Sequence, residues 1–276
     1  MKANRESVVL LLAVAIALMA PFVAHAADAS AWSEDTRSTA RLIAATPRAG
    51  ELRAGVEIKL QPGWKTYWRY PGDSGVPPRF DFTGSENLRA ARVQWPAPHA
   101  FSDETGTSIG YKDGVIFPLR ITARDPSKPV TLKLKLEYAV CDKLCIPAEG
   151  HAALTLGDTT GAQDAALAKA EAQVPVPVSA HDAGLVARRV TATLKPLVML
   201  DIASPKSEAY QVFVEGPNAE WALPIPKGAL GAPPGHRHFE LELDGIPPGV
   251  DPMGAFELTF TVVGGERPFV VTTHLD

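Results

Sequence analysis

The chain contains two cysteines, Cys141 and Cys145, with three residues between them. Thiols this close suit a redox disulfide, which opens and closes when a thiolate attacks one of its sulfurs. They also suit a structural disulfide that pins a turn. The chain-entropy model assigns such a bond only about 2 kcal/mol for a loop of about five residues, against about 4.7 kcal/mol for about 100. We therefore interpret the pair as a redox site, with a structural disulfide as the alternative.

The residues before Cys141 alternate between apolar and polar side chains over the range 130–140. The apolar members are Val130, Leu132, Leu134, Leu136, Tyr138 and Val140. A period of two over this length predicts a half-buried antiparallel β-strand and places Cys141 on the face turned away from the core. The cysteines then flank a tight hairpin turn and face each other at about 5 Å, which a disulfide tolerates. We expect both thiols to be reachable by solvent.

The first 26 residues have the features of a secretory signal peptide. Val8–Ala20 is an apolar run that is too short for a comfortable membrane span, and Ala24-His25-Ala26 fits the rule for cleavage before Ala27. No later stretch is apolar for the roughly 18 residues that a spanning helix requires. We expect a periplasmic protein without a transmembrane segment in the mature chain. Export implies an oxidising compartment, where a cysteine pair forms a disulfide unless something reduces it.

Composition favours an all-β fold and excludes nucleic acid as a partner. The net charge of −4 offers no basic surface, and 25 prolines and 22 glycines lie among short alternating runs. We predict two β-sandwich domains, at 27–158 and 183–276, joined by a short helix and a Pro-rich linker within 159–182. The strands expected in the second domain are Leu197–Ile202, Tyr210–Val214, His238–Leu243, Phe256–Val263 and Phe269–Thr273. That domain has no cysteine, so we expect it to bind or to act as a spacer.

Two segments of the first domain bear on the thiol pair. Trp64, Tyr67, Trp68 and Tyr70 form the most aromatic stretch of the chain, and they either fill the core or cover the thiols. Residues 101–110 are small, polar and punctuated by glycine, which predicts a surface loop.

Several of these segments resemble one known family. They are Gly63–Trp68, Tyr111–Ile121, Leu136–Cys141 and Cys145–Glu149. They look like the N-terminal periplasmic domain of DsbD-type thiol:disulfide interchange proteins and of the related copper-sensitivity-suppressor branch, the ScsB-like proteins. The resemblance spans roughly 41–156, and the C-terminal half resembles the second sandwich of ScsB-like proteins more weakly. The spacing of the cysteines is shorter here than in the best-known members.

The resemblance implies an immunoglobulin-like sandwich that carries electrons. A membrane-embedded thiol reductant on another polypeptide would reduce the pair, which would then reduce disulfide-bearing periplasmic proteins. Cys145 matches the cysteine that forms mixed disulfides, and Cys141 matches its resolving partner. Tyr67 matches an aromatic residue beside the site, and Phe101 begins the segment that matches a cap loop. We assign Trp64 and Tyr111 to the same surroundings.

The sequence thus predicts a thiol–disulfide oxidoreductase without a cofactor or a metal. One alternative is a non-enzymatic adaptor with a structural disulfide. Another is Cu(I) handling by Cys141, Cys145 and His151, because thiolates favour that ion. We interpret His236 and His238, which alternate in one predicted strand, as exposed strand residues and not as a copper site. No set of residues indicates a hydrolase or a kinase.

Overall fold

The computed structural model describes residues 27–276 except 74, 104–105, 158 and 191–195. The predicted signal peptide, residues 1–26, lies outside this part of the chain. Within the described residues, no helix is long and apolar enough to span a membrane. Strands make up almost all of the regular secondary structure of the described residues and form two β-sandwiches, which confirms the predicted all-β class.

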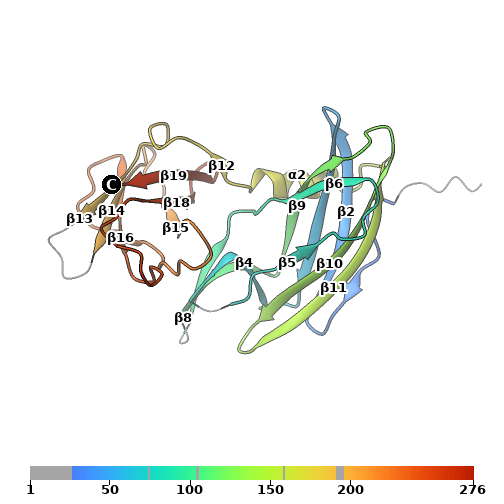
Figure 1. Ribbon diagram of the computed structural model, residues 1–276, viewed down its shortest axis with the longest axis horizontal. Helices are drawn as coiled ribbons and strands as arrows, with labels where there is room; N and C mark the ends of the chain where they lie inside the picture. Colours follow the sequence, from blue (N-terminus) through green and yellow to red (C-terminus); the bar gives the residue numbers. More distant parts are fainter. Residues whose placement is uncertain (1–26, 74, 104–105, 158, 191–195) are drawn as a thin grey trace, which may run out of the picture.

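The first sandwich contains a five-stranded and a six-stranded sheet (Figure 1). The five-stranded sheet has the order β1 (Ser33–Glu34), β2 (Ser38–Arg48), β3 (Glu51–Leu60), β9 (Gly114–Ala123) and β6 (Leu88–Val93). The six-stranded sheet has the order β11 (Cys145–Leu156), β10 (Val130–Cys141), β4 (Lys65–Gly72), β8 (Gly106–Lys112) and β7 (His99–Asp103), with β5 (Arg79–Asp81) paired to β10. The core between the sheets is formed by alternate residues of these strands.

Strand β10 has the predicted alternation over most of its length. Leu132, Leu134 and Leu136 are buried, whereas Lys133 and Lys135 on the other face are exposed. The alternation ends near the cysteine turn, where four consecutive residues from Tyr138 are all buried. Strand β4 pairs with this end of β10, and the side chain of its Tyr67 packs over Ala139 and Cys141 on the outer face.

Within the range 101–110, the described residues 101–103 and 106–110 do not form the predicted surface loop. They belong to β7 and β8, which pair antiparallel with Phe101 opposite Ser108. These strands extend the sheet beside β4, because Thr66 and Tyr67 of β4 pair with Tyr111 and Gly110 of β8. A segment rich in small polar residues can form a strand when a neighbouring strand satisfies its backbone.

The helix α2 (Asp164–Ala172) packs on the five-stranded sheet. Its Leu167 is fully buried against Ile43 and Ala45. Arg53 bonds both carboxylate oxygens of Glu171, at 3.0 Å and 2.7 Å, and so ties the end of the helix to β3. The helix predicted from the composition of residues 164–172 is therefore present, and it covers one side of the first sandwich.

The second sandwich contains two four-stranded sheets. The first has the order β12 (Val176–Pro177), β19 (Phe269–Leu275), β18 (Phe256–Val263) and β15 (Gln211–Glu215). The second has the order β13 (Leu185–Val190), β14 (Leu197–Ala203), β17 (His236–Glu242) and β16 (Lys227–Ala229). All five predicted strands are present, with ends shifted by a few residues, whereas β13 and β16 were not predicted. The predicted linker contributes β12, which pairs in parallel with β19.

Candidate redox-active site

A disulfide joins the two cysteines across the turn between β10 and β11. Cys141 ends β10 and Cys145 begins β11, and the two residues are direct partners in the antiparallel register. Their Cα atoms are 4.2 Å apart, close to the spacing of a directly opposed pair in such a ladder. The predicted hairpin, with its cysteines facing each other, is therefore confirmed.

The two cysteines differ in their exposure to solvent. Cys145 is exposed, whereas Cys141 is only 2% exposed. The prediction that both are reachable by solvent is thus wrong for Cys141. Its side chain is on the outer face of the sheet, as the alternation required, but Tyr67 of β4 lies on the same face and covers it. The pattern of one strand cannot show what a neighbouring strand places above it.

Tyr67 is the predicted site residue that directly contacts the disulfide. Its hydroxyl oxygen lies 2.6 Å from Cys141 Sγ and 3.0 Å from Cys145 Sγ. Its ring is buried and packs against Ala139 of β10. Gly75 lies against the outer side of the ring, because a Cβ at that position would come within 2.4 Å of Tyr67 Cε1. The ring is therefore enclosed on two sides, and its hydroxyl is held at the sulfurs.

Lys65 and Phe101 lie on the same face of the sheet as Cys141. Lys65 is the direct partner of Cys141 in the register of β4 and β10, so the two side chains are neighbours. The Lys65 Nζ is 5.6 Å from the centre of the Phe101 ring and 3.5 Å from Ser108 Oγ. The Lys65 ammonium therefore lies toward β8 and β7, on the side of β4 away from β10. Sequence reasoning missed Lys65, although its spacing of two from Tyr67 on one strand places both on one face.

The other two predicted surrounding residues lie elsewhere. Trp64 contacts Arg37, whose guanidinium carbon is 5.4 Å from the centre of the Trp64 ring. Tyr111 is on the opposite face of the sheet from Tyr67, and its hydroxyl donates to the Pro96 carbonyl at 2.8 Å. Burial raises the pKa of Tyr111 well above its usual range. The structure does not bring Tyr111 to the sulfurs.

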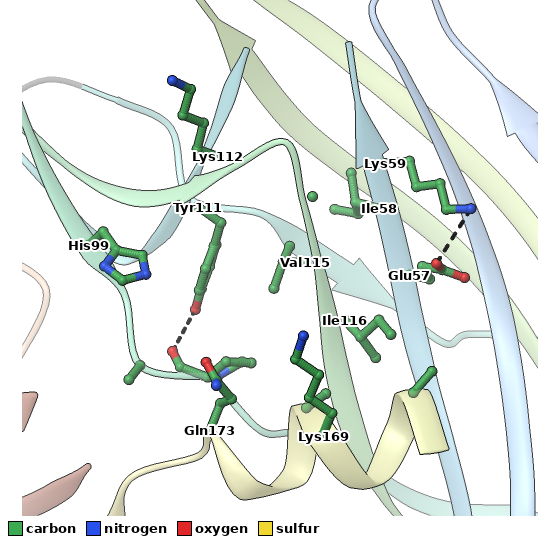
Figure 2. A pocket seen from close by; sticks show the side chains of 15 residues that line it. Glu57, Ile58, Lys59, His99, Tyr111, Lys112, Val115, Ile116, Lys169 and Gln173 are labelled. Carbon is green, nitrogen blue, oxygen red and sulfur yellow. Dashed lines mark hydrogen bonds and ion pairs between the residues drawn. The ribbon is translucent and has the colours of Figure 1, made fainter. Parts of the chain in front are cut away.

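Tyr111 instead lines a cavity of about 360 Å³ between the first sandwich and α2 (Figure 2). Its lining is mixed: Val115 and Ile116 are apolar, Glu57 and Lys59 are charged, and Lys169 of α2 points into it (Figure 2). Neither cysteine lines this cavity, and neither does Tyr67.

The histidines considered as copper ligands do not join the cysteines. His151 follows Cys145 by six residues in β11, which places it about 20 Å away along the strand. Its Nε2 is 2.6 Å from Glu149 Oε1. His236 and His238 both face Asp201, at 2.7 Å and 3.8 Å. Among the described residues, no group of three or more His, Cys, Asp or Glu side chains is arranged to hold a metal ion.

Residues 37–157 match a known family model, described as the N-terminal domain of the thiol:disulfide interchange protein DsbD. This match covers the core strands of the first sandwich and the whole cysteine hairpin. The resemblance of the first sandwich to DsbD-type N-terminal domains, noted in the sequence, is therefore confirmed.

One solved structure resembles both sandwiches. It is the N-terminal periplasmic domain of ScsB from Proteus mirabilis, which matches with a TM-score of 0.71 and 22% sequence identity. The superposition covers 90% of this chain and 98% of that one. At this level of sequence identity, the structural match shows that the two proteins share a fold. No curated protein matches the chain.

Proposed function

We propose that this protein is a periplasmic thiol–disulfide interchange module that reduces or exchanges disulfides of partner proteins through Cys141 and Cys145. The observation that supports it is the asymmetry of the pair. One sulfur-bearing residue is exposed, and the other is buried beside a tyrosine hydroxyl. An exposed sulfur can enter a partner's site, while a buried neighbour can resolve the mixed disulfide without itself meeting the partner.

The exchange follows from these positions. In the reduced protein, the Cys145 thiolate attacks one sulfur of a partner's disulfide, and the partner's second sulfur leaves as a thiolate and takes a proton from solvent. The Cys141 thiolate then attacks the sulfur of Cys145. This step restores the Cys141–Cys145 bond and releases the partner's remaining sulfur as a thiolate, which is also protonated. The partner gains two electrons, and the hairpin loses the same two.

Tyr67 supplies a polar group for this chemistry. A hydroxyl within hydrogen-bond distance of both sulfurs can donate to a thiolate on either one. This bond lowers the free energy of the reduced state relative to the disulfide, which makes the pair easier to reduce.

Each cycle needs a reductant, because the hairpin gives two electrons to its partner. We propose a membrane-embedded thiol reductant on another polypeptide as the source, and disulfide-bearing periplasmic proteins as the acceptors. The family model that matches the first sandwich supports this assignment. The residues predicted as a signal peptide support a periplasmic location.

Trapping of mixed disulfides tests this function. A Cys141→Ala variant keeps the exposed Cys145 and lacks the resolving thiol, so it should accumulate covalent complexes with periplasmic proteins that a reductant releases. Cys145→Ala is the matched control and should trap little, because Cys141 is buried. Equal trapping by both variants, or by neither, would contradict the assignment.

The reduction potential separates this function from the adaptor alternative. Structural disulfides of secreted proteins have potentials below about −300 mV, which glutathione does not reduce. We expect a higher potential for the Cys141–Cys145 pair, measured by equilibration with glutathione buffers. A value in the structural range would favour a two-sandwich adaptor in which the disulfide only closes a turn.

A further inference from the structure

Strand β4 contacts the disulfide and the second sandwich with adjacent residues. Tyr67 lies at the sulfurs, and the next residue, Trp68, lies on the opposite face of the strand. The Trp68 ring is 5.9 Å from the ring of Phe213, which belongs to β15 of the second sandwich. Both side chains are fully buried. The contact between the sandwiches is therefore part of a continuous apolar core.

Strand β15 presents its two faces to different sandwiches. Val212 and Val214 are buried in the core of the second sandwich, whereas Phe213 between them is buried in the core cluster of the first. Ile225 and Val263, also from the second sandwich, pack against the same cluster. A period of two thus explains how one short strand serves both cores.

Two polar contacts continue this interface along β4. Arg69 donates from Nε and Nη2 to the two carboxylate oxygens of Glu215, at 2.8 Å and 2.7 Å. The Tyr70 hydroxyl donates to the Leu223 carbonyl at 2.6 Å. Burial, followed by the nearby carboxylates of Asp73 and Glu215, raises the pKa of Tyr70 to about 12. A two-pronged arginine–carboxylate pair fixes orientation as well as distance, so these contacts define where β4 lies.

Backbone pairing with the neighbouring strands of the first sandwich is interrupted in β4 after Tyr67. The register between β4 and β8 runs from Lys65 to Tyr67 and resumes only at Gly72. The register between β4 and β10 covers Lys65 and Thr66. Beyond Tyr67, contacts with the second sandwich therefore supplement the core packing of Trp68 in positioning the strand.

We propose that the second sandwich sets the redox properties of the cysteine pair by holding β4, with Phe213 and Glu215 as positioning residues for Tyr67. This inference rests on the proposed function. A hydroxyl stabilises a thiolate only at hydrogen-bond distance, and a shift of β4 by a fraction of an ångström weakens that bond. Loosening the contact between the sandwiches therefore raises the free energy of the reduced state and lowers the reduction potential.

Redox titration of the full chain in glutathione buffers tests the inference. Glu215→Gln removes the charge partner of Arg69, and Phe213→Leu loosens the apolar contact without changing a charge. We expect each variant to shift the equilibrium constant toward the disulfide by about threefold to tenfold, which is about 15 to 30 mV. The control is Glu266→Gln, which removes an exposed ion pair with Lys206 elsewhere in the second sandwich and should leave the potential unchanged.

A double-mutant comparison separates positioning from a general loss of structure. If Phe213 and Glu215 act through the Tyr67 hydroxyl, their substitution should have no effect on the potential of a Tyr67→Phe protein. An equal shift in that background, or no shift in the Tyr67 protein, would overturn the inference. The titration uses only glutathione, so its outcome is independent of whether partner proteins are trapped.

Discussion

Cys145 is exposed at the start of β11, while Cys141, directly opposite it, is buried beneath the Tyr67 hydroxyl. The two thiols of the reduced protein should therefore react at different rates with a small alkylating agent. Iodoacetamide should modify Cys145 first. Cys141 must wait for β4 to open locally, and an opening that costs about 1.4 kcal/mol or more slows the reaction about tenfold or more.

Peptide mass spectrometry after timed quenching measures both rates. In urea the two cysteines should react at similar rates, since the difference arises from the fold. Similar rates in the folded protein would show that Tyr67 does not shield Cys141.

Removing the Tyr67 hydroxyl should make the disulfide harder to reduce. A hydrogen bond to a charged group contributes about 1.5 to 3 kcal/mol, so Tyr67→Phe should favour the disulfide by about tenfold or more, or about 30 mV. Tyr111→Phe is a matched control, because it removes a buried hydroxyl that donates to Pro96 on the other face of the sheet. Each variant should lose about 1 kcal/mol of stability, while only the first should change the potential. A shift in both would assign the effect to loss of structure.

The sequence was sufficient for the features that depend on one strand or on one turn. The alternation of 130–138 and the three-residue spacing of the cysteines are local properties, so the strand and the hairpin could be predicted. The burial of Cys141 could not, because it depends on Tyr67, which is 74 residues earlier in the chain. Contacts of this range come from sheet register, and no local pattern specifies them.

The same limit applies to residues 101–110 and to the second sandwich. The small polar residues of 101–110 suit a loop, yet 101–103 and 106–110 lie in β7 and β8, which pair with each other and, through β8, with β4. Val212, Phe213 and Val214 are all apolar, so their sequence has no apolar/polar period. The sequence therefore could not show that Phe213 faces the other sandwich. The aromatic segment at 64–70 was predicted either to fill the core or to cover the thiols, and the structure divides these roles between Trp68 and Tyr67.

Reduction of the disulfide should cost little stability. The bond closes a loop of about five residues, so the chain-entropy model predicts a loss of about 2 kcal/mol in the free energy of unfolding. Urea titration of the oxidised protein and of the protein kept reduced by a phosphine measures this difference. A variant with both cysteines replaced by alanine should not respond to the phosphine. A loss of 4 kcal/mol or more would assign the disulfide a structural role.

Acid should weaken the contact between the N-terminal segment and the residues before α2. The Asp28 carboxylate accepts hydrogen bonds from the Thr160 hydroxyl and from the backbone amides of Thr160 and Ala162. The Thr160 hydroxyl bond, followed by the backbone bonds, lowers the pKa of Asp28 below its ordinary value of 3.8. A lowered pKa in the folded state means that the stabilisation is complete above about pH 3.8 and is lost as the pH falls through the lower folded value.

Asp28→Asn tests this dependence. The variant should unfold at lower urea concentration than the parent at pH 7, because its amide cannot provide a charged acceptor for these donors. The difference between the two proteins should shrink as the pH falls below 3.8, where the parent's carboxyl also becomes neutral. Asp276→Asn is the control, since that side chain is 94% exposed at the end of the chain and should show no such convergence. A difference that stays constant down to pH 2 would mean that the charge of Asp28 does not contribute.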